Sequence, residues 1–489
     1  MDMFADLDAT AQAALVKRGQ ASPLELGDAA IARIETLDPR LNAVIHRRFE
    51  EARVDASGAD LPEGPFRGVP FLLKDAGATQ AGFPQTRGNA ALKHLGRRSS
   101  TETPLGSRFR SAGLVTLGIT NMPEFGLVGD TQPLAFGPIR NPWDVEACVG
   151  GSSGGSCAAV ASGMVPVAHG SDGAGSIRIP ASWRGLVGLK PSRGRTQCRI
   201  DDEDLWLAEF VVSRTVCDAA LMLDCVHDSV PGALYHQCPP DRPYAKFTRQ
   251  SPPPLKVGLL TQHAHVDVDL ECVVSVEQTG ALLESLGHLV EPAYPTALFD
   301  VLPERLVEPS LAAGYLQDVF AAPETEIGRR VTADDAEPYS LALRREEPWV
   351  TARDAAAADA WHRDKSGRLA AWWADGFDLL VTPTMCELAP LLIEPSTLSL
   401  AGMGAAERRS VAFTETFNAS GQPVISLPVQ ATAEGLPIGV QLVAAEGRKD
   451  LLLQVSRQLE DAIDWARRWP PVSAKALDGE EGSCASACC

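Results

Sequence analysis

The arrangement of apolar and polar positions predicts an amphipathic helix near the start of the chain. Residues 22–25 read Ser-Pro-Leu-Glu, which has the spacing of a capping box with proline at the first helical position. From Leu26 to Leu37, apolar side chains recur every three or four positions, as on one face of a helix. We expect Pro39 to end this helix, because proline inside a helix removes a backbone hydrogen bond.

Apolar runs further along the chain predict a β-α-β unit. A strand is expected at residues 255–260, an amphipathic helix around 273–282 and a second strand at 289–290. The proline-rich stretch 251–254, just before this unit, is a candidate linker. More strands are predicted at 377–381, 424–427 and 440–443, and a closing helix at 451–463. This order of elements indicates a layered α/β body.

Composition indicates a folded, acidic protein. The chain has 489 residues, 45% of them hydrophobic, and its 63 acidic and 44 basic residues give a net charge of −19. Normal apolar content at this length allows a large core and excludes bulk disorder. A strongly negative chain repels phosphate backbones and anionic lipids, so we expect neither nucleic acid nor a membrane as a partner.

The ends of the chain and the cysteines suggest the compartment. The N-terminus lacks the basic start, apolar run and cleavage site of a signal peptide, which favours a cytoplasmic protein. The 11 cysteines include no C-x-x-C pair, so we expect free, mostly buried thiols. Residues 472–489 follow a Pro-Pro pair and are expected to be a disordered tail. Three cysteines lie in that tail: Cys484, Cys488 and Cys489.

Two stretches rich in glycine and serine are the strongest candidates for chemistry. Residues 150–156 read Gly-Gly-Ser-Ser-Gly-Gly-Ser, and residues 170–180 read Gly-Ser-Asp-Gly-Ala-Gly-Ser-Ile-Arg-Ile-Pro. A helix of small residues is expected to begin just after Ser152, where its partial positive charge favours nearby negative charge. Consecutive backbone amides from Gly173 to Ser176 are suited to hold an oxyanion.

Other catalytic motifs fit these stretches less well. The Gly-Lys-Ser/Thr end of a phosphate-binding loop is missing, and the chain has no Ser-x-x-Lys string. Residues 151–155 match the G-x-S-x-G string of a nucleophile elbow, but residues 141–144 before them are typical of a loop rather than a strand. The last histidine, His362, lies in a charged helical stretch. Flexible loops without chemistry are the remaining alternative.

Lys74 is the candidate base for such a serine. It lies near the end of an apolar, strand-like run, residues 68–75. Burial disfavours the ammonium form and lowers a lysine's pKa, which leaves a neutral amine able to accept a proton. The alternative is a strand end at the surface, where Lys74 and Asp75 would be solvated.

Together, residues 68–75, 150–156 and 170–180 closely resemble the amidase signature family. The resemblance covers nearly the whole chain, with further motifs at 118–124, 140–143, 185–191, 417–423 and 435–441. It implies one catalytic domain, residues 1–471 with its core at about 65–200. The implied fold is α/β, with a large mixed β-sheet core covered by helices on both faces.

The resemblance also implies a catalytic triad. Ser176 matches the nucleophile, Ser152 a bridging serine that follows a cis peptide bond, and Lys74 the base, with no metal or organic cofactor. Ala174 departs from the family, which commonly has glycine there, but alanine keeps the N–H donor. The oxyanion hole matches the backbone amides of Gly173, Ala174, Gly175 and Ser176.

Supporting roles are implied by the same resemblance. Asp172 and Arg178 match residues that brace the serine loops, and Ser153 matches a supporting hydroxyl. Three positions match segments that line the substrate site: Asn121, Met122 and Gln422.

The implied activity is that of an amidohydrolase that forms a serine acyl-enzyme. It would cleave small or oligomeric carboxamides, with carbamates (urethanes) and esters as further substrates, and a homodimer is expected. Within the family, the chain is most similar to bacterial 6-aminohexanoate cyclic dimer hydrolases, which degrade nylon oligomers. Two alternatives stay open: a glutamine-hydrolysing subunit of a tRNA-dependent amidotransferase, and a catalytically silent binding protein.

Overall fold

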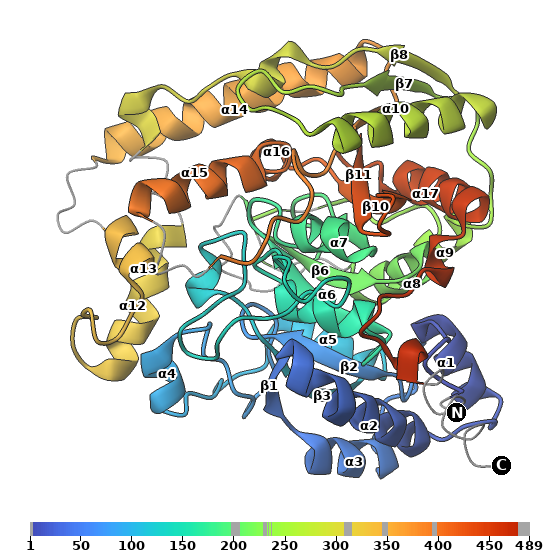
Figure 1. Cartoon of the computed structure of the whole chain (residues 1–489), viewed down its shortest axis with the longest axis vertical. Coiled ribbons are helices and arrows are strands. Elements are labelled where there is room, and N and C mark those ends of the chain that lie inside the picture. The colour runs from blue at the N-terminus through green and yellow to red at the C-terminus, as the bar shows by residue number, and fades with distance from the viewer. Residues whose placement is uncertain are drawn as a thin grey trace.

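A mixed β-sheet runs through the centre of the protein (Figure 1). The structure is a computed structural model that describes residues 3–196, 206–227, 237–307, 315–344, 351–393 and 399–477, together with 232, 234 and 235. In these residues the sheet has 11 strands in the order β1-β3-β2-β4-β6-β5-β10-β11-β9-β7-β8. Every residue of β2, β4, β5, β9 and β11 is buried, so both faces of the sheet are covered. This confirms the predicted fold class.

The strands form parallel and antiparallel pairs. Strand β2 runs parallel to β3 and β4, and β7 runs parallel to β8 and β9, while the other neighbours are antiparallel. The bounds are β1 (Val44–Arg47), β2 (Pro70–Lys74), β3 (Val115–Thr120), β4 (Val167–Asp172), β5 (Val187–Lys190), β6 (Ala208–Ser213), β7 (Lys256–Leu259), β8 (Leu289–Pro292), β9 (Leu379–Pro383), β10 (Val424–Ala431) and β11 (Pro437–Ala444).

Helices surround the sheet along its length. In Figure 1, α2 and α3 lie at one end of the molecule, and α10 and α14 lie at the other end with β7 and β8. The bounds are α1 (Ala9–Lys17), α2 (Pro23–Leu41), α3 (Phe49–Ser57), α4 (Ala90–His94), α5 (Pro104–Ser111), α6 (Gly154–Ala161), α7 (Arg178–Arg184), α8 (Val216–Val226), α9 (Tyr244–Phe247), α10 (Leu270–Ser285), α12 (Tyr315–Ile327), α13 (Pro338–Leu343), α14 (Ala352–Ala374), α15 (Leu400–Val411), α16 (Glu415–Ser420) and α17 (Lys449–Ile463). Among the described helices, none has both the length and the apolar character of a membrane span.

Helix α2 confirms the predicted start but not the predicted end. The Ser22 hydroxyl accepts the Glu25 backbone N–H at 3.2 Å, and the Glu25 carboxylate accepts the Ser22 N–H at 2.7 Å. The helix continues through Pro39 to Leu41, so the expectation that Pro39 ends it is wrong. Pro39 lacks the N–H of one helical bond, and the helix continues for two more residues despite this loss. The Asp38 carboxylate then accepts the backbone N–H groups of Ala43 and Val44, which lead into β1, at 2.7 and 3.0 Å.

The predicted β-α-β unit is present as β7, α10 and β8, with the two strands parallel. The stretch 251–254 leads directly into β7, which pairs with β9 in the central sheet, so it does not separate two sheets. The remaining predictions correspond to β9, β10, β11 and α17, with bounds that differ by a few residues.

The C-terminal segment is packed beyond the predicted limit of the domain. Val472 and Ala474 are each 4% exposed and belong to the main hydrophobic core, so the expectation that the tail begins at 472 is wrong. Apolar burial holds this segment in place. Residues 478–489, with the three tail cysteines, lie outside the described residues, as does Cys198.

The cysteines that the structure describes are free thiols, as predicted. Four of them are buried, Cys217 and Cys225 are partly buried, and Cys238 is exposed. The buried ones are Cys148, Cys157, Cys272 and Cys386.

Candidate active site

Lys74 is the last residue of β2, and its amine is enclosed by serine side chains. The Nζ atom lies 2.7 Å from Ser152 Oγ, 2.8 Å from Ser171 Oγ and 3.0 Å from Ser153 Oγ. The residue is only 2% exposed. The alternative of a solvated strand end is therefore wrong.

Three separate segments build this enclosure. Strand β2 lies between β3 and β4, which places the end of β2 in the interior, and Ser171 comes from β4. Ser152 and Ser153 come from the loop before α6, where the peptide bond between Gly151 and Ser152 is cis, as expected from the family resemblance. Gly126, with φ of +72°, lies against this loop, and a Cβ there would be 3.2 Å from Ser152 Oγ. Glycine thus allows the close approach of the two loops.

The hydrogen bonds around Nζ suit either an ammonium, which has three donors, or a neutral amine. A neutral amine donates two protons and accepts one. The Ser153 hydroxyl donates to the Ser171 carbonyl at 3.1 Å, so its oxygen accepts a proton from Nζ. The lone pair is then left for the hydroxyl of Ser152 or Ser171.

Burial also determines the charge of Lys74. It lowers the pKa of the amine to about 7, although the negative charges of Glu209 and Asp172 oppose the shift. Taking an ammonium out of water costs more free energy than these charges return. A large fraction of Lys74 is therefore neutral at neutral pH.

Ser176 lies in the neighbouring loop, between β4 and α7, and is partly accessible, unlike Lys74 and Ser152. Its carbonyl accepts the Ser153 backbone N–H at 3.2 Å, which ties the two serine loops together. The amides before it belong to Gly173, Ala174 and Gly175, of which the first two are partly accessible. A partly accessible serine next to backbone donors is suited to meet a substrate carbonyl.

Thr414 holds the shape of this loop. Its hydroxyl donates to the Ala174 carbonyl. Gly175 has φ of +139°, and a Cβ there would lie 2.4 Å from Thr414 Oγ1, so only glycine fits. Because C=O and N–H point in opposite directions across a trans peptide, holding the Ala174 carbonyl also orients the Gly175 N–H.

Asp172 and Arg178 form a buried ion pair at the base of the loop. Two parallel contacts of 2.9 Å join the guanidinium to the carboxylate. Burial alone would raise the pKa of Asp172, but Arg178 and the Asn418 amide lower it to about 2. The Asn418 amide also donates to the Asp172 carbonyl at 2.8 Å. The pair links the loop to α16 without touching Lys74, in agreement with a bracing role.

Comparison with known proteins identifies the family. The amidase family model matches residues 25–453. A 6-aminohexanoate-cyclic-dimer hydrolase from Pseudomonas sp. (strain NK87) is 43% identical over 485 residues, which cover 95% of this chain and 96% of that protein. The chain belongs to the amidase family. A solved structure of 6-aminohexanoate cyclic dimer hydrolase complexed with substrate superposes with a TM-score of 0.90 at 40% identity, covering 96% of this chain and 99% of the other.

The amidase is therefore a hydrolase that acts on carbon–nitrogen bonds other than peptide bonds, and a small-molecule amide fits this family as the substrate. This confirms the predicted enzyme class. A solved glutamyl-tRNA(Gln) amidotransferase component from Thermotoga maritima is more distant, at 26% identity over 94% of this chain and 95% of that one, with a TM-score of 0.71. This similarity supports the amidotransferase alternative only at a distance.

The three predicted lining residues are closed off in this structure. Asn121, Met122 and Gln422 are at most 2% exposed. The Asn121 backbone bonds to Ala43 and Gly155, and the Ser420 hydroxyl bonds to the Gln422 side chain. Substrate contact by these three residues stays a prediction.

Sequence reasoning missed several residues of the amidase site. Ser171 lies inside the quoted motif 170–180 and Asn418 inside 417–423, so position within these motifs was an available signal. No local sequence signal marks Thr414, His169 or Glu209, because their roles depend on contacts between distant segments. His362, the candidate of the nucleophile-elbow alternative, instead lies on α14 with its ring against Trp206 and Trp361.

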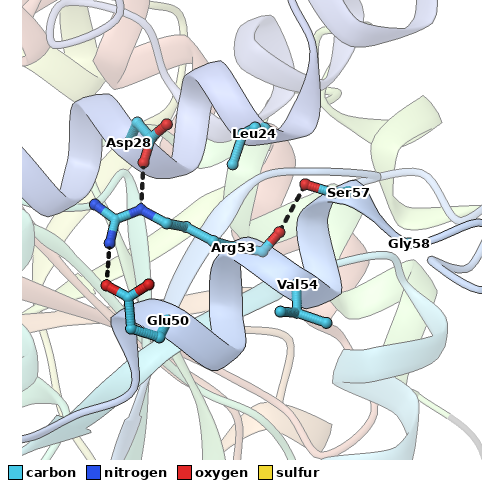
Figure 2. Close-up of a pocket in the computed structure, with 7 residues that line it drawn as sticks. All are labelled: Leu24, Asp28, Glu50, Arg53, Val54, Ser57 and Gly58. Atoms are coloured by element: carbon cyan, nitrogen blue, oxygen red, sulfur yellow. Dashed lines mark hydrogen bonds and ion pairs between the residues drawn. The ribbon is translucent and has the colours of Figure 1, made fainter.

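A surface pocket lies elsewhere, between α2 and α3 (Figure 2). Its residues are Leu24, Asp28, Glu50, Arg53, Val54, Ser57 and Gly58. The Arg53 guanidinium bonds to Asp28 at 2.7 Å and to Glu50 at 2.6 Å, as Figure 2 shows. The charged groups of this pocket are thus paired with one another, and none of the predicted catalytic residues lines the pocket.

Proposed function

We propose that this amidase hydrolyses short aliphatic oligoamides through Ser176, Ser152 and Lys74. The observation that carries the proposal is the 2.7 Å contact between the Lys74 amine and Ser152 Oγ in a buried site beside the accessible Ser176 loop. A neutral amine in this place can take up a proton that a serine releases.

Acylation replaces the C–N bond of the substrate with a C–O bond to Ser176, and its net effect is to move one proton from Ser176 to the leaving amine. Ser176 Oγ bonds to the substrate carbonyl carbon, its proton passes to Ser152, and the Ser152 proton passes to Lys74. When the tetrahedral intermediate collapses, the C–N bond breaks, and the proton returns through Ser152 to the leaving amine. Water then attacks the acyl-enzyme by the same route, which releases the carboxylic acid and frees Ser176.

Backbone amides stabilise the negative charge that forms on the carbonyl oxygen. The donors proposed are the N–H groups of residues 173–176. Removing one donor of an oxyanion hole typically costs about 3–4 kcal/mol in the barrier. The Thr414 contact and the Asp172–Arg178 pair keep these amides in one arrangement before substrate arrives. Ala174 keeps its N–H, so the departure from glycine leaves the number of donors unchanged.

The substrate proposal follows from similarity. The curated relative named above is a hydrolase of the 6-aminohexanoate cyclic dimer, and the similarity extends over nearly the whole length of both chains. We therefore take this cyclic amide as the first candidate, with aryl amides, carbamates and esters as further ones. A cytoplasmic homodimer without nucleic acid is part of the same proposal.

A substrate panel with the purified chain tests the proposal. The panel holds the cyclic dimer, the linear dimer, an aryl amide, a carbamate, an ester and glutamine, ranked by kcat/KM. We expect the cyclic dimer to rank first and the Ser176→Ala variant to lose activity on all of them. A preference for glutamine would favour the amidotransferase alternative. Labelling of Ser176 by a fluorophosphonate would exclude the alternative of a silent binding protein.

A further inference from the structure

Two buried side chains near Lys74 have no part in the proton transfers proposed above. His169 on β4 and Glu209 on β6 are 0% and 2% exposed at their side chains, and β2, β4 and β6 are consecutive in the sheet. His169 Nδ1 lies 3.3 Å from the backbone nitrogen of Lys74, and its Nε2 lies 3.1 Å from Glu209 Oε2. The imidazole thus joins the backbone of the proposed base to a carboxylate.

The contacts fix the protons of this pair. The Lys74 backbone N–H is a donor, so His169 Nδ1 accepts and the imidazole proton is on Nε2. Nε2 then donates to Glu209 Oε2, which also accepts the Ala78 backbone N–H at 2.8 Å. Accepting two donors suits an ionised carboxylate. The pair therefore carries one negative charge in the core, where the Phe109 ring packs on the imidazole at 5.6 Å.

We infer that the His169–Glu209 pair is a positioning element, which holds the Lys74 backbone and sets, through the charge of Glu209, the pH range in which Lys74 acts as a base. The inference rests on the proposed role of Lys74. A buried negative charge favours the ammonium form of a nearby lysine. Several negative charges raise the pKa of Lys74 against the effect of burial, and Glu209 has the largest effect among them.

The other titratable groups around Lys74 act less strongly. Asp172 on β4 and Cys157 on α6 also raise the pKa of Lys74, but by less than Glu209. The Asp172 charge is compensated by Arg178 at 2.9 Å. Asp75, the next residue, directs its carboxylate to the loop at residues 86–88. Glu209 is therefore the group to change.

Glu209→Gln tests the inference, because it keeps the size and one acceptor oxygen and removes the charge. The measurement is the second-order rate constant for labelling of Ser176 by a fluorophosphonate, recorded against pH, since labelling needs the base but no particular substrate. We expect the midpoint of the acid limb to move down by about one pH unit. A purely structural role would lower the plateau rate and leave the midpoint in place. A midpoint that is unchanged or raised overturns the inference.

Glu209→Asp is the matched control, because it keeps the charge with a shorter side chain. Its midpoint should stay near that of the wild type even if its plateau rate falls, and a downward shift like that of Glu209→Gln would overturn the inference. Should Glu209→Gln fail to fold, the double variant His169→Met/Glu209→Met tests the same expectation, because apolar side chains of similar size often replace a buried pair without loss of stability.

Lys74→Met separates this inference from the proposed function. If Lys74→Met is labelled as fast as the wild type, the proposed base is wrong. If Lys74→Met is not labelled but Glu209→Gln keeps the wild-type midpoint, the base stands and only the role of the His169–Glu209 pair is wrong.

Discussion

The region around Lys74 and the region around Lys190 and Lys449 both bury lysines, but only the first has the surroundings of a catalytic base. Lys74 lies among three serine hydroxyls beside an accessible loop. Lys190 and Lys449 lie at the end of β5 and the start of α17, and are 1% and 0% exposed. Burial lowers the pKa of Lys449 to about 7, the same value as for Lys74.

The difference is in what each amine contacts. Lys190 Nζ donates to the Pro191 carbonyl at 2.9 Å, and Lys449 Nζ lies 2.9 Å from Ser192 Oγ. Ser192 is itself 1% exposed. A lowered pKa is thus insufficient for base catalysis: the amine must also reach, through hydroxyls, a nucleophile that a substrate can touch.

The largest expected effect is that of Ser176→Ala. The variant keeps the loop backbone and removes the proposed nucleophile, so kcat/KM on the best amide should fall by about 10⁴-fold or more. The melting temperature should stay near that of the wild type. Activity within tenfold of the wild type would show that Ser176 is not the nucleophile. The accessible serine would then not be what distinguishes the Lys74 region from the other one.

Lys74→Met should come next, with a loss in kcat of about 10³-fold, because it removes the proton acceptor and keeps an apolar stem. The same substitution at the second region, Lys449→Met, is the matched control. Equal losses in both variants would contradict the comparison, since they would mean that buried lysines matter here only for folding.

The pH–rate profile should show an acid limb near the pKa of Lys74. This pKa is lowered by burial to about 7, and the amine acts only when neutral, so kcat/KM should rise with pH through that value and then level off. Well below the midpoint, each pH unit should cost about tenfold. A limb near the ordinary lysine value would mean that Lys74 is not buried during catalysis.

Thr414→Val should lower kcat by about tenfold with little change in KM. The substitution removes the hydroxyl that holds the Ala174 carbonyl and keeps the shape, so the Gly175 N–H is oriented less well in the transition state. Thr414→Ser, which keeps the hydroxyl, should restore most of the rate. A loss in both variants alike would indicate packing rather than hydrogen bonding.

The smallest effect on activity is expected for Lys449→Met, within about twofold of the wild type. Its effect should appear in stability. The folded-state pKa of Lys449 lies below the unfolded value, so the penalty for burying the amine grows as the pH falls from about 10 toward 7. The melting temperature of Lys449→Met should therefore exceed that of the wild type at pH 6 by more than at pH 9. A difference that does not vary with pH would contradict this account.

Much of the fold was predictable because its signals are local. Each predicted element depends on a pattern of residues that are close together in the sequence. Examples are the capping box of α2, the elements of the unit β7-α10-β8 and the strand that ends at Lys74. The end of α2 was misplaced, because the missing N–H of Pro39 costs the helix one backbone hydrogen bond and does not stop it before Leu41. The start of the tail was misplaced because Val472 and Ala474 gain their stability from a core made by distant segments.

The sequence by itself determined the chemistry available to this protein: two glycine–serine loops with a run of backbone amides, and a lysine near the end of an apolar strand. Glycine and serine spacing is local, and so is a strand's apolar pattern. Only the tertiary structure decided which groups meet. Lys74 and Ser171 are 97 positions apart, and Arg178 and Asn418 are 240 positions apart. Burial by these distant segments lowers the pKa of Lys74, and no pattern within β2 carries that information.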